Sequence, residues 1–456
     1  MIKLTTQQLA QILNANLIGD GQAVVENINT DTRKTVSNSL FFALKGEHFD
    51  AHQYLDKAVE QGATALVVQQ ANTEIATPQL VVADTRLALG QLAKWLREKI
   101  NPRTVAMTGS SGKTTVKEMT ASILQQTAGN PEAVLFTNGN FNNDIGVPLT
   151  LLRLTEQHKF AVIELGANHQ GEIDYTTHLA QPEAALVNNV AAAHLEGFGS
   201  IDGVARAKGE IYRGLTQNGV AIINNEHNYI ELWQKEIGSH AIQYFNGGDY
   251  KAENVKHSPN GSMFTLVSPK GSIEINLPYL GEHNVKNALA ATALAMNVGA
   301  SLADVKAGLE HRSQVKGRLF PIQVNENLLL LDDTYNANVD SLQAAIDVLK
   351  SYDAFRILLV GDMKELGEDS LKCHQQVGEH AKQAKLDLVL SYGTESAVIS
   401  EAVLGKHFTD KAELTAYALD IIKQKLQENQ KVVVLAKGSR SMKMEETIYS
   451  LKDSLC

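Results

Sequence analysis

The sequence predicts an α/β protein of three domains, and three observations support this expectation. The chain has 456 residues, and a domain takes roughly 150 residues as a soft prior. Short apolar runs alternate with segments of helical periodicity, a pattern typical of mostly parallel sheets covered on both faces. One glycine-rich segment, Thr108 to Thr115, lies between a predicted buried strand and a predicted helix.

The composition excludes several classes of protein. The net charge is −10, whereas a duplex nucleic-acid binder needs a basic face. The two cysteines cannot form a disulfide framework and do not have zinc-ligand spacing. The N-terminus lacks the apolar core of a signal peptide, and no run approaches the ~18 apolar residues of a membrane span. We therefore expect a cytoplasmic protein without nucleic-acid or membrane partners.

Residues 1–100 are expected to form a small α/β domain. Leu9 and Leu13 follow helical spacing behind Thr5 and Thr6, which suit a helix cap. Two apolar runs are predicted as buried strands, and a helix after them ends at a proline. These elements are Ala65–Val68, Leu80–Ala83 and Arg86–Lys99.

Residues 101–313 are expected to form a central domain with a parallel sheet, similar to P-loop ATPases. An alanine-rich helix is predicted over His283–Val298, with Gly299 as its cap. The predicted strands are Thr104–Thr108, Phe160–Leu165, Ala184–Val190 and Val220–Asn224.

Residues 314–456 are expected to form a Rossmann-like domain that follows the polar segment His311–Gly317. In such doubly wound sheets, ligands bind at the carboxyl ends of the strands. Polar residues that follow the strands are therefore candidates for binding. The predicted strands are Leu328–Leu331, Arg356–Val360, Leu386–Leu390 and Lys431–Leu435.

The segment TGSSGKTT is predicted to bind phosphate. Gly109 and Gly112 let the backbone curl so that successive N–H groups face an anion. Lys113 would reach the outer phosphates of a nucleotide, and the Thr114 hydroxyl would hold Mg²⁺. The N-terminus of the following helix would also face the anion.

The spacing of this segment is shorter than the strict pattern GxxxxGK[ST]. Met107 stands where the first glycine of that pattern would be, so the sequence offers GxxGK[ST] instead. Spacing alone leaves a chance turn equally open. The preceding strand and the following amphipathic helix favour phosphate binding.

Three more polar residues follow strands of the central domain, whose carboxyl ends meet at one edge of a parallel sheet. Glu164 closes a strand and suits Mg²⁺, which prefers oxygen ligands. Without further information, His194 is better explained as a capping or packing histidine. Lys208 is by composition a solvated lysine; the alternative is a desolvated amine that reacts with CO₂ to give a metal-binding carbamate.

Three polar segments leave two interpretations open. The asparagine-rich stretch Asn138–Asn143 suits a turn, although four asparagines in six residues favour a function. Asp332 and Asp333 either cap the next element or bind a ligand at a strand end. Lys437–Ser441, KGSRS, is either a solvated loop or an anion site.

At these residues the chain resembles the Mur ligase family, whose members add amino acids to the UDP-N-acetylmuramoyl (UDP-MurNAc) peptide precursor of bacterial peptidoglycan. The resemblance extends along the whole chain. Within the family, DDTYNANVDS at Asp332–Ser341 and VGDMKELG at Val360–Gly367 favour the member that joins D-alanyl-D-alanine to UDP-MurNAc-tripeptide. The other matching segments are NTDTRKTVSNSLFFALKG at Asn29–Gly46, TGSSGKTT, TNGNFNNDIGVP at Thr137–Pro148, ELG with Glu164, AAHLEGFGS with His194, AKGEI with Lys208, and GEHNVKNALAA at Gly281–Ala291.

The resemblance implies roles for the residues that match these motifs. It implies that ATP is bound by Gly109, Ser110, Ser111, Gly112, Lys113, Thr114, Thr115, His283, Asn284, Asn287, Arg318 and Asp333. It implies two Mg²⁺ ions, held by Thr114, Glu164, His194 and a carbamylated Lys208, and a catalytic set of Lys113, Glu164, His194 and Lys208. It implies that the UDP-MurNAc-tripeptide and the dipeptide contact Thr32, Arg33, Lys45, Gly46, Asn138, Asn142, Asn143, Tyr335 and Asn336.

The sequence departs from the family at one position. Ala51 stands in EHFDAHQY where many relatives have glycine, so the shape of that loop stays open. Asp50 and His52 therefore receive no role.

The implied reaction is ATP-dependent peptide-bond formation by a monomer. The peptide carboxylate attacks the γ-phosphate to give an acyl phosphate and ADP, and the dipeptide amine then displaces phosphate. Three domains also suggest a closure that excludes water. Three alternatives stay open: a folylpolyglutamate synthase, against which the UDP-end motif and YNAN argue; a P-loop kinase; and a nucleotide-gated binding protein without chemistry.

Overall fold

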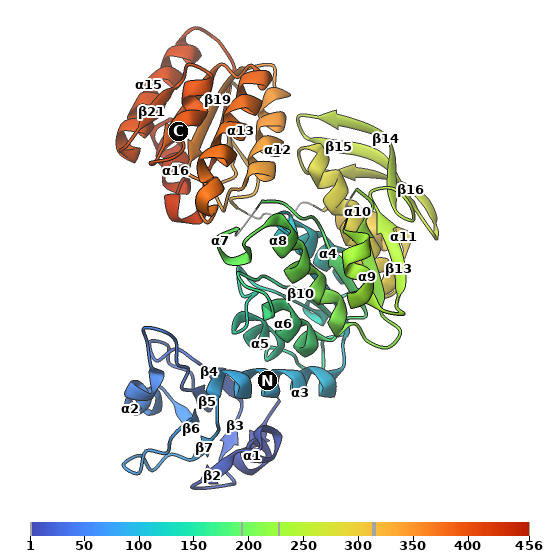
Figure 1. The fold of residues 1–456 in the computed structure, drawn as a ribbon, viewed down its shortest axis with the longest axis vertical. Coiled ribbons are helices and arrows are strands. Elements are labelled where there is room, and N and C mark those ends of the chain that lie inside the picture. Colours follow the sequence, from blue (N-terminus) through green and yellow to red (C-terminus); the bar gives the residue numbers. More distant parts are fainter. Residues whose placement is uncertain (1, 193–194, 227–228, 312–315, 456) are drawn as a thin grey trace.

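The computed structural model describes residues 2–192, 195–226, 229–311 and 316–455. Three α/β units, each built on a mostly parallel sheet, follow one another along the long axis of the molecule (Figure 1). This arrangement confirms the predicted α/β fold. Within the described ranges, no helix has the length and apolar character needed to cross a membrane.

The N-terminal unit has a sheet of order β2-β7-β6-β5-β4, which is parallel except for β2. Its first helix begins as predicted, because Thr5 Oγ1 accepts the N–H of Gln8 at 3.2 Å and Gln8 Oε1 accepts the N–H of Thr5 at 2.9 Å. Strands β1 and β3 form a separate antiparallel pair. The bounds are β1 Leu4–Thr5, α1 Thr6–Leu13, β2 Asn16–Ile18, β3 Val24–Val25, β4 Asn27–Asn29, β5 Ser39–Phe42, α2 Leu55–Glu60, β6 Ala63–Val68, β7 Gln79–Val81 and α3 Thr85–Ile100.

The central unit has a parallel sheet of order β13-β12-β11-β8-β10-β9. Helices α4, α10 and α11 pack on one face, and α5 and α6 on the other. The bounds are β8 Arg103–Thr108, α4 Lys113–Ala128, β9 Val134–Phe136, α5 Gly146–Leu151, β10 Phe160–Glu164, α6 Glu172–Ala180, β11 Ala184–Val187, α7 Leu195–Phe198, α8 Ile201–Gly209, β12 Val220–Asn224, α9 Ile230–Ile237, β13 Ala241–Phe245, α10 Glu282–Asn297 and α11 Leu302–Glu310.

The register of this sheet places the predicted site at one edge. Strand β8 lies between β10 and β11. Glu164 pairs with Met107, and Val187 pairs with Thr108. The carboxyl ends of these strands therefore open on the loop that follows β8, as the prediction of a parallel sheet requires.

An antiparallel sheet between β13 and α10 was not predicted from the sequence. It consists of β14 Lys251–Ser258, β15 Gly261–Ser268 and β16 Gly271–Leu277. Most side chains of β14 are exposed, so this strand has no apolar run that would reveal it. The sheet lies beside α10 and α11, on the side of the central unit nearest the C-terminal unit (Figure 1).

The C-terminal unit has a sheet of order β17-β18-β22-β19-β20-β21, in which only β17 is antiparallel to its neighbour among the described strands. Helices α12 and α13 cover one face, and α15 and α16 the other. The predicted strands are confirmed as β18, β19, β20 and β22, with ends shifted by one or two residues. The bounds are β17 Phe320–Asn325, β18 Leu328–Asp332, α12 Val339–Lys350, β19 Phe355–Gly361, α13 Ser370–Ala384, β20 Leu388–Tyr392, α14 Ala397–Ala402, β21 Lys406–Phe408, α15 Lys411–Gln427, β22 Val432–Lys437 and α16 Glu445–Leu455.

Helix α3 connects the N-terminal and central units and shares a core with α6. Arg97 of α3 is 3% exposed. Its Nε donates to the carbonyl of Ala180 and its Nη2 to that of Gln181, each at 2.8 Å. A buried arginine therefore satisfies the backbone at the end of α6 and holds the two units together.

Candidate active site

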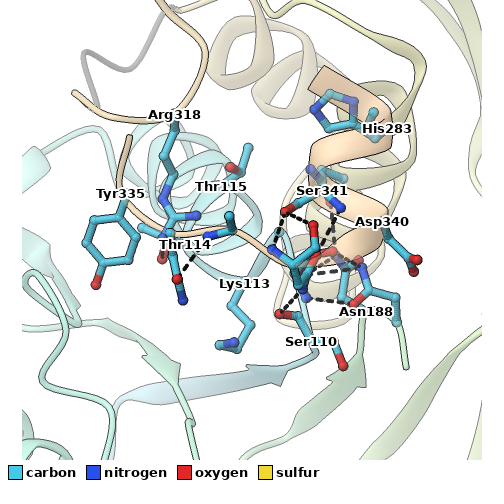
Figure 2. A pocket seen from close by; sticks show the side chains of 18 of the residues that line it. Ser110, Lys113, Thr114, Thr115, Asn188, His283, Arg318, Tyr335, Asp340 and Ser341 are labelled. Carbon is cyan, nitrogen blue, oxygen red and sulfur yellow. Dashed lines mark hydrogen bonds between the residues drawn. The ribbon is translucent and has the colours of Figure 1, made fainter. Parts of the chain in front are cut away.

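A cavity of about 520 Å³ lies between the central and C-terminal units. Figure 2 shows Arg318 and Tyr335 at one end of it and His283 and Asp340 at the other, with Lys113 between them. Most of the predicted nucleotide and metal residues therefore meet in one place. The predicted residues that line the cavity are Ser110, Ser111, Gly112, Lys113, Thr114, Thr115, Asn142, Glu164, Lys208, His283, Asn284, Asn287, Arg318, Asp333, Tyr335 and Asn336.

The loop between β8 and α4 needs glycine at its last position. Gly112 has φ +74°, and a Cβ there would lie 2.5 Å from Asn188 Nδ2 and 2.6 Å from Asn287 Oδ1. Helix α4 begins directly after it, at Lys113. The N–H groups of a first helical turn have no partner within the helix, so this turn presents donors to an anion in the cavity.

Lys113 folds back over this loop. Its Nζ donates to the carbonyl of Gly109 at 2.7 Å. Burial lowers the pKa of Lys113, the charge of Glu164 opposes that shift, and the charge of Arg318 adds to it. The ammonium group therefore lies among charged groups at the point where a phosphate on the loop would need a cation.

Arg318 reaches this loop from the C-terminal unit. Its Nη2 donates to Thr114 Oγ1 at 2.9 Å, and its guanidinium lies 4.3 Å from the ring centroid of Tyr335. Its Nε is buried and has no hydrogen-bond partner among the described residues. A buried donor of this kind favours an acceptor supplied by a ligand.

Glu164 ends β10 and is 2% exposed. Its Oε1 accepts a hydrogen bond from Asn142 Nδ2 at 2.8 Å, and its N–H donates to Thr137 Oγ1 at 3.0 Å. Its Oε2 is buried without a hydrogen-bond partner in the described part of the chain. Because burying an unpaired carboxylate oxygen is costly, this atom is well suited to ligate a cation.

Lys208 of α8 is 2% exposed and lines the same cavity. Burial, and then the nearby charge of Lys113, hold its pKa well below the ordinary value of 10.5. The structure therefore contradicts the interpretation of Lys208 as a solvated lysine. A neutral amine is also the form that reacts with CO₂.

Three asparagine side chains form a relay beneath the loop. Asn284 Nδ2 donates to the carbonyl of Leu280 at 2.8 Å, Asn287 Nδ2 donates to Asn284 Oδ1 at 3.0 Å, and Asn188 Nδ2 donates to Asn287 Oδ1 at 3.0 Å. Asn188 Nδ2 also donates to the carbonyl of Ser111 at 3.1 Å. The relay connects the start of α10 to the loop, so Asn287 supports the loop as well as lining the cavity.

His283, in the first turn of α10, lies at the opposite end of the cavity from Arg318 (Figure 2). Burial, and then the charges of Lys437 and Lys286, lower its pKa to about 4, while Asp347 opposes the shift. Its imidazole is therefore neutral at pH 7 and is suited to contact with an uncharged group.

Asp333 organises the C-terminal side of the cavity. Its Oδ2 pairs with Lys437 Nζ at 2.7 Å, and its Oδ1 accepts the N–H of Leu319 at 3.1 Å. Lys437 Nζ also donates to the carbonyl of Asn336 at 2.9 Å. The end of β18 is therefore tied to the end of β22 and to the residue that follows Arg318.

The polar segments with two interpretations have local partners. Asp332 Oδ1 accepts the Oγ1–H of Thr334 at 2.6 Å, which confirms a turn-capping role. In KGSRS, Ser439 Oγ accepts the N–H of Lys364 at 2.8 Å, and Arg440 pairs with Glu445 at 2.6 Å. Of this segment, only Lys437 lines the cavity.

Several predicted residues lie elsewhere. Arg33 pairs with Asp31 at 2.8 Å in the N-terminal unit and is 84% exposed, and Asn143 Oδ1 accepts the N–H of Gly146 at 2.8 Å. His194 lies outside the described residues. The predicted residues that do not line the cavity are Thr32, Arg33, Lys45, Gly46, Gly109, Asn138 and Asn143.

Sequence reasoning missed three asparagines that hold the loop, and the first is Asn188, which donates to the carbonyl of Ser111. Asn189 Oδ1 accepts the N–H of Ser111 at 2.8 Å, and Asn189 O accepts the N–H of Ser110 at 3.1 Å. Asn338 caps α12 through Ser341 and donates from Nδ2 to the carbonyl of Ser110 at 3.4 Å. The available signal for Asn188 and Asn189 was a pair of asparagines that follows the apolar run of β11, which ends at Val187; for Asn338, it was its place three residues before Ser341.

The fold and the cavity fit one class of protein: α/β enzymes that carry a glycine-lysine loop at the edge of a parallel sheet and complete the site from a second sheet. Three family models match successive parts of the chain. Residues 24–96 match "Mur ligase family, catalytic domain", residues 107–295 match "Mur ligase middle domain", and residues 317–440 match "Mur ligase, glutamate ligase domain".

Full-length relatives agree with these matches. The chain is 77% identical over 455 residues to UDP-N-acetylmuramoyl-tripeptide–D-alanyl-D-alanine ligase of Haemophilus influenzae, covering 100% of both chains. The crystal structure of MurF from Acinetobacter baumannii superposes with a TM-score of 0.94 at 40% identity over 99% of both chains. MurF ligase from Thermotoga maritima in complex with ADP gives a TM-score of 0.83 at 25% identity over 94% of this chain and 98% of that one. The chain belongs to the Mur ligase family, which confirms the resemblance seen in the sequence.

Proposed function

We propose that this protein joins D-alanyl-D-alanine to UDP-MurNAc-tripeptide at the expense of ATP, giving UDP-MurNAc-pentapeptide, ADP and phosphate. The observation that carries the proposal is the cavity in which Lys113 at the start of α4, the buried Glu164 and the interdomain Arg318 meet. The named activity of the Haemophilus influenzae relative supports the choice of substrates. The Thermotoga maritima structure with ADP supports the nucleotide.

The reaction has two steps. The carboxylate of the tripeptide attacks the γ-phosphorus of ATP, the bond to ADP breaks, and an acyl phosphate forms. The amine of the dipeptide, which arrives deprotonated, attacks the acyl carbon, phosphate leaves with the electron pair of the broken C–O bond, and the proton lost by the nitrogen passes to the departing phosphate. Lys113 and Arg318 supply fixed positive charge where the phosphoryl oxygens gain negative charge.

The residues around Glu164 fit Mg²⁺. Glu164 Oε2 is an unpaired buried carboxylate oxygen and Thr114 supplies a hydroxyl, and Mg²⁺ is usually held by one or two carboxylates together with substrate phosphates. Across the described ranges, no group of three or more His, Cys, Asp and Glu side chains is placed to hold a metal. Bound Mg²⁺ would offset charge on the phosphoryl oxygens.

We propose a carbamate on Lys208 as a further oxygen ligand, and His194 as another ligand of the same ion. The burial of Lys208 and its lowered pKa support a neutral amine, which the reaction with CO₂ requires. Carbamylation would replace a desolvated amine by a group that carries negative charge toward the cation site. Two Mg²⁺ ions are then proposed, one on Thr114 and Glu164 and the other on Glu164, His194 and Lys208.

The remaining roles follow the same proposal. Residues 1–100 would bind the UDP end through Thr32, Arg33, Lys45 and Gly46; residues 101–313 would bind ATP; and residues 314–456 would contribute Arg318 and Asp333. Asn138, Asn142, Asn143, Tyr335 and Asn336 would contact the peptide substrates or the phosphates. We propose a cytoplasmic monomer whose cavity closes on its substrates and excludes water from the acyl phosphate.

The test is phosphate release with ATP, Mg²⁺ and UDP-MurNAc-tripeptide across a panel of amino acids and dipeptides. We expect release that depends on D-alanyl-D-alanine and a roughly 100-fold or greater loss of kcat in Lys113→Ala. A kinase would leave a stable phosphorylated product, and a binding protein would bind ATP without releasing phosphate. A folylpolyglutamate synthase would release phosphate with glutamate and a folate, and not with the dipeptide.

A further inference from the structure

The carboxylate of Glu164 has two oxygens in different surroundings. Oε1 accepts a hydrogen bond from Asn142 Nδ2 at 2.8 Å. Oε2 is buried and has no hydrogen-bond partner among the described residues. Glu164 is 2% exposed, so bulk water does not supply a hydrogen-bond donor to Oε2 in place of a protein partner. Asn142 therefore engages one oxygen of Glu164 and leaves the other for a ligand in the cavity.

The orientation of the Asn142 amide follows from chemistry. An ionised carboxylate only accepts hydrogen bonds, so the NH₂ group of the amide must face Glu164. The backbone of Asn142 is fixed as well, because its carbonyl accepts the N–H of Gly166 at 2.8 Å. A Cβ on Gly166 would lie 2.8 Å from Asn142 Oδ1, so glycine at position 166 leaves the room that the amide occupies.

The segment that carries Asn142 is anchored to the helix after the phosphate loop. Thr137 Oγ1 accepts the N–H of Glu164 at 3.0 Å, and the carbonyl of Thr137 accepts Lys117 Nζ at 2.8 Å. Lys117 lies in α4 and is 1% exposed. The position of Asn142 relative to Glu164 is therefore tied to the helix that presents the phosphate loop.

We propose that Asn142 is a positioning residue that leaves Oε2 as the single Glu164 oxygen for metal, shared by both proposed Mg²⁺ ions, and thereby sets the preference of the site for Mg²⁺ over larger cations. Mg²⁺ demands near-octahedral geometry at short distances, whereas Ca²⁺ accepts both oxygens of one carboxylate in a more flexible shell. Holding Oε1 on an amide prevents two-oxygen coordination. This inference rests on the proposed function and gives Asn142 a role other than contact with the peptide substrate.

The experiment measures binding of ADP by calorimetry at a series of Mg²⁺ or Ca²⁺ concentrations, which does not depend on turnover. In Asn142→Ala, we expect the apparent Mg²⁺ affinity to fall about 10-fold or more, as is typical when a partner of a metal ligand is removed. The apparent Ca²⁺ affinity should fall less, because the freed carboxylate offers both oxygens. The ratio of Mg²⁺ to Ca²⁺ affinity therefore falls.

Two further variants make the result decisive. Gly166→Ala leaves the asparagine in the chain but displaces its amide, so the affinity ratio should fall in the same direction. Asn130→Ala removes an exposed asparagine that caps a short turn before β9, and the ratio should stay at the wild-type value. Thermal unfolding shows which variants are folded, and Gly166→Ala replaces Asn142→Ala if the latter does not fold.

An unchanged ratio of Mg²⁺ to Ca²⁺ affinity in a folded Asn142→Ala or Gly166→Ala protein would overturn the inference. That failure differs from failure of the proposed function. If wild-type protein bound no ADP with Mg²⁺, the proposed nucleotide site itself would be wrong. If wild type bound ADP with Mg²⁺ and the variants did so equally well, only the role of Asn142 would be wrong.

Discussion

The guanidinium of Arg318 donates to the hydroxyl of Thr114 at 2.9 Å, across the boundary between the C-terminal and central units. Thr114 belongs to the first turn of α4, so the contact reaches the phosphate loop itself. The guanidinium carbon of Arg318 also lies over the ring of Tyr335, 4.3 Å from its centroid. The C-terminal unit therefore contributes a positively charged side chain to a cavity whose other wall belongs to the central unit.

Arg318→Lys tests this contact. Lysine keeps the charge but loses the planar fork and the stacking on Tyr335. We expect kcat for phosphate release to fall about 10- to 100-fold, with little change in the temperature of unfolding. The control is Arg356→Lys, in the same unit, where arginine pairs with Asp387 at 2.8 Å and kcat should be unaffected. A kcat for Arg318→Lys within twofold of wild type would contradict the proposed role.

Lys208→Met separates stability from activity. The pKa of Lys208 is well below the 10.5 of the unfolded chain. As the pH decreases below 10.5, the unfolded chain therefore binds a proton that the native state does not, and the free energy of unfolding decreases. Methionine removes this cost. In CO₂-free buffer at pH 7, we expect the free energy of unfolding to rise by on the order of 1–3 kcal/mol, while ligase activity is lost.

The matched control for Lys208 is Lys235→Met, on the exposed side of α9, which should give no such gain. Urea unfolding at several pH values measures both. The advantage of Lys208→Met should grow as the pH falls from 10.5. A loss of stability in Lys208→Met under CO₂-free conditions would show that the buried amine does not lower the free energy of unfolding of the native protein.

His283→Gln tests the neutral imidazole at the end of the cavity. Burial lowers the pKa of His283 from 6.5 to about 4, so between these values the unfolded chain binds a proton that the native state does not. Native stability is therefore lost as the pH falls from 6.5 to 4. We expect His283→Gln to gain stability relative to wild type across this window and to match the pH trend of wild type above pH 7.

Thermal unfolding from pH 4 to pH 8 measures the effect of His283→Gln. His48→Gln replaces an exposed histidine of the N-terminal unit and serves as the control. The difference in unfolding temperature between His283→Gln and wild type should widen toward acid pH. A constant difference would contradict the lowered pKa.

Arg97→Ala tests the junction between the N-terminal and central units. The substitution leaves the carbonyls of Ala180 and Gln181 without their donor, and buried unsatisfied groups are costly. We expect the free energy of unfolding to fall by about 2–4 kcal/mol in urea. Arg86→Ala, on the same helix, removes a pair with Asp144 in which the arginine is 54% exposed, and it should cost less than about 1 kcal/mol.

Much of the fold was predictable because buried parallel strands have continuous apolar sequences. Strands β8, β10, β18 and β22 are of this kind, and their exposure is low along almost their whole length. Strand β14 is mostly exposed, so apolar runs do not reveal it. Short strands at the sheet edges, such as β9 and β21, carry too few residues to show a period.

In the candidate site, residues with a distinctive chemical type were predictable. Lys113 follows the glycine-rich loop and Glu164 ends a strand, where phosphate and metal chemistry are expected, and the structure places both on the cavity. Asn188, Asn189 and Asn338 escaped prediction because their contribution depends on where an amide points. Asparagine is common in turns and caps, so its type alone does not distinguish a loop anchor from an ordinary turn residue.

The relay of Asn284, Asn287 and Asn188 beneath the phosphate loop consists of neutral amides. Amide groups do not titrate in the physiological range, and hydrogen bonds between neutral partners depend little on ionic strength. The shape of the loop should therefore persist across the pH and salt conditions of a growing cell. Any sensitivity of the site to pH and salt should therefore come from the charged groups that line the cavity.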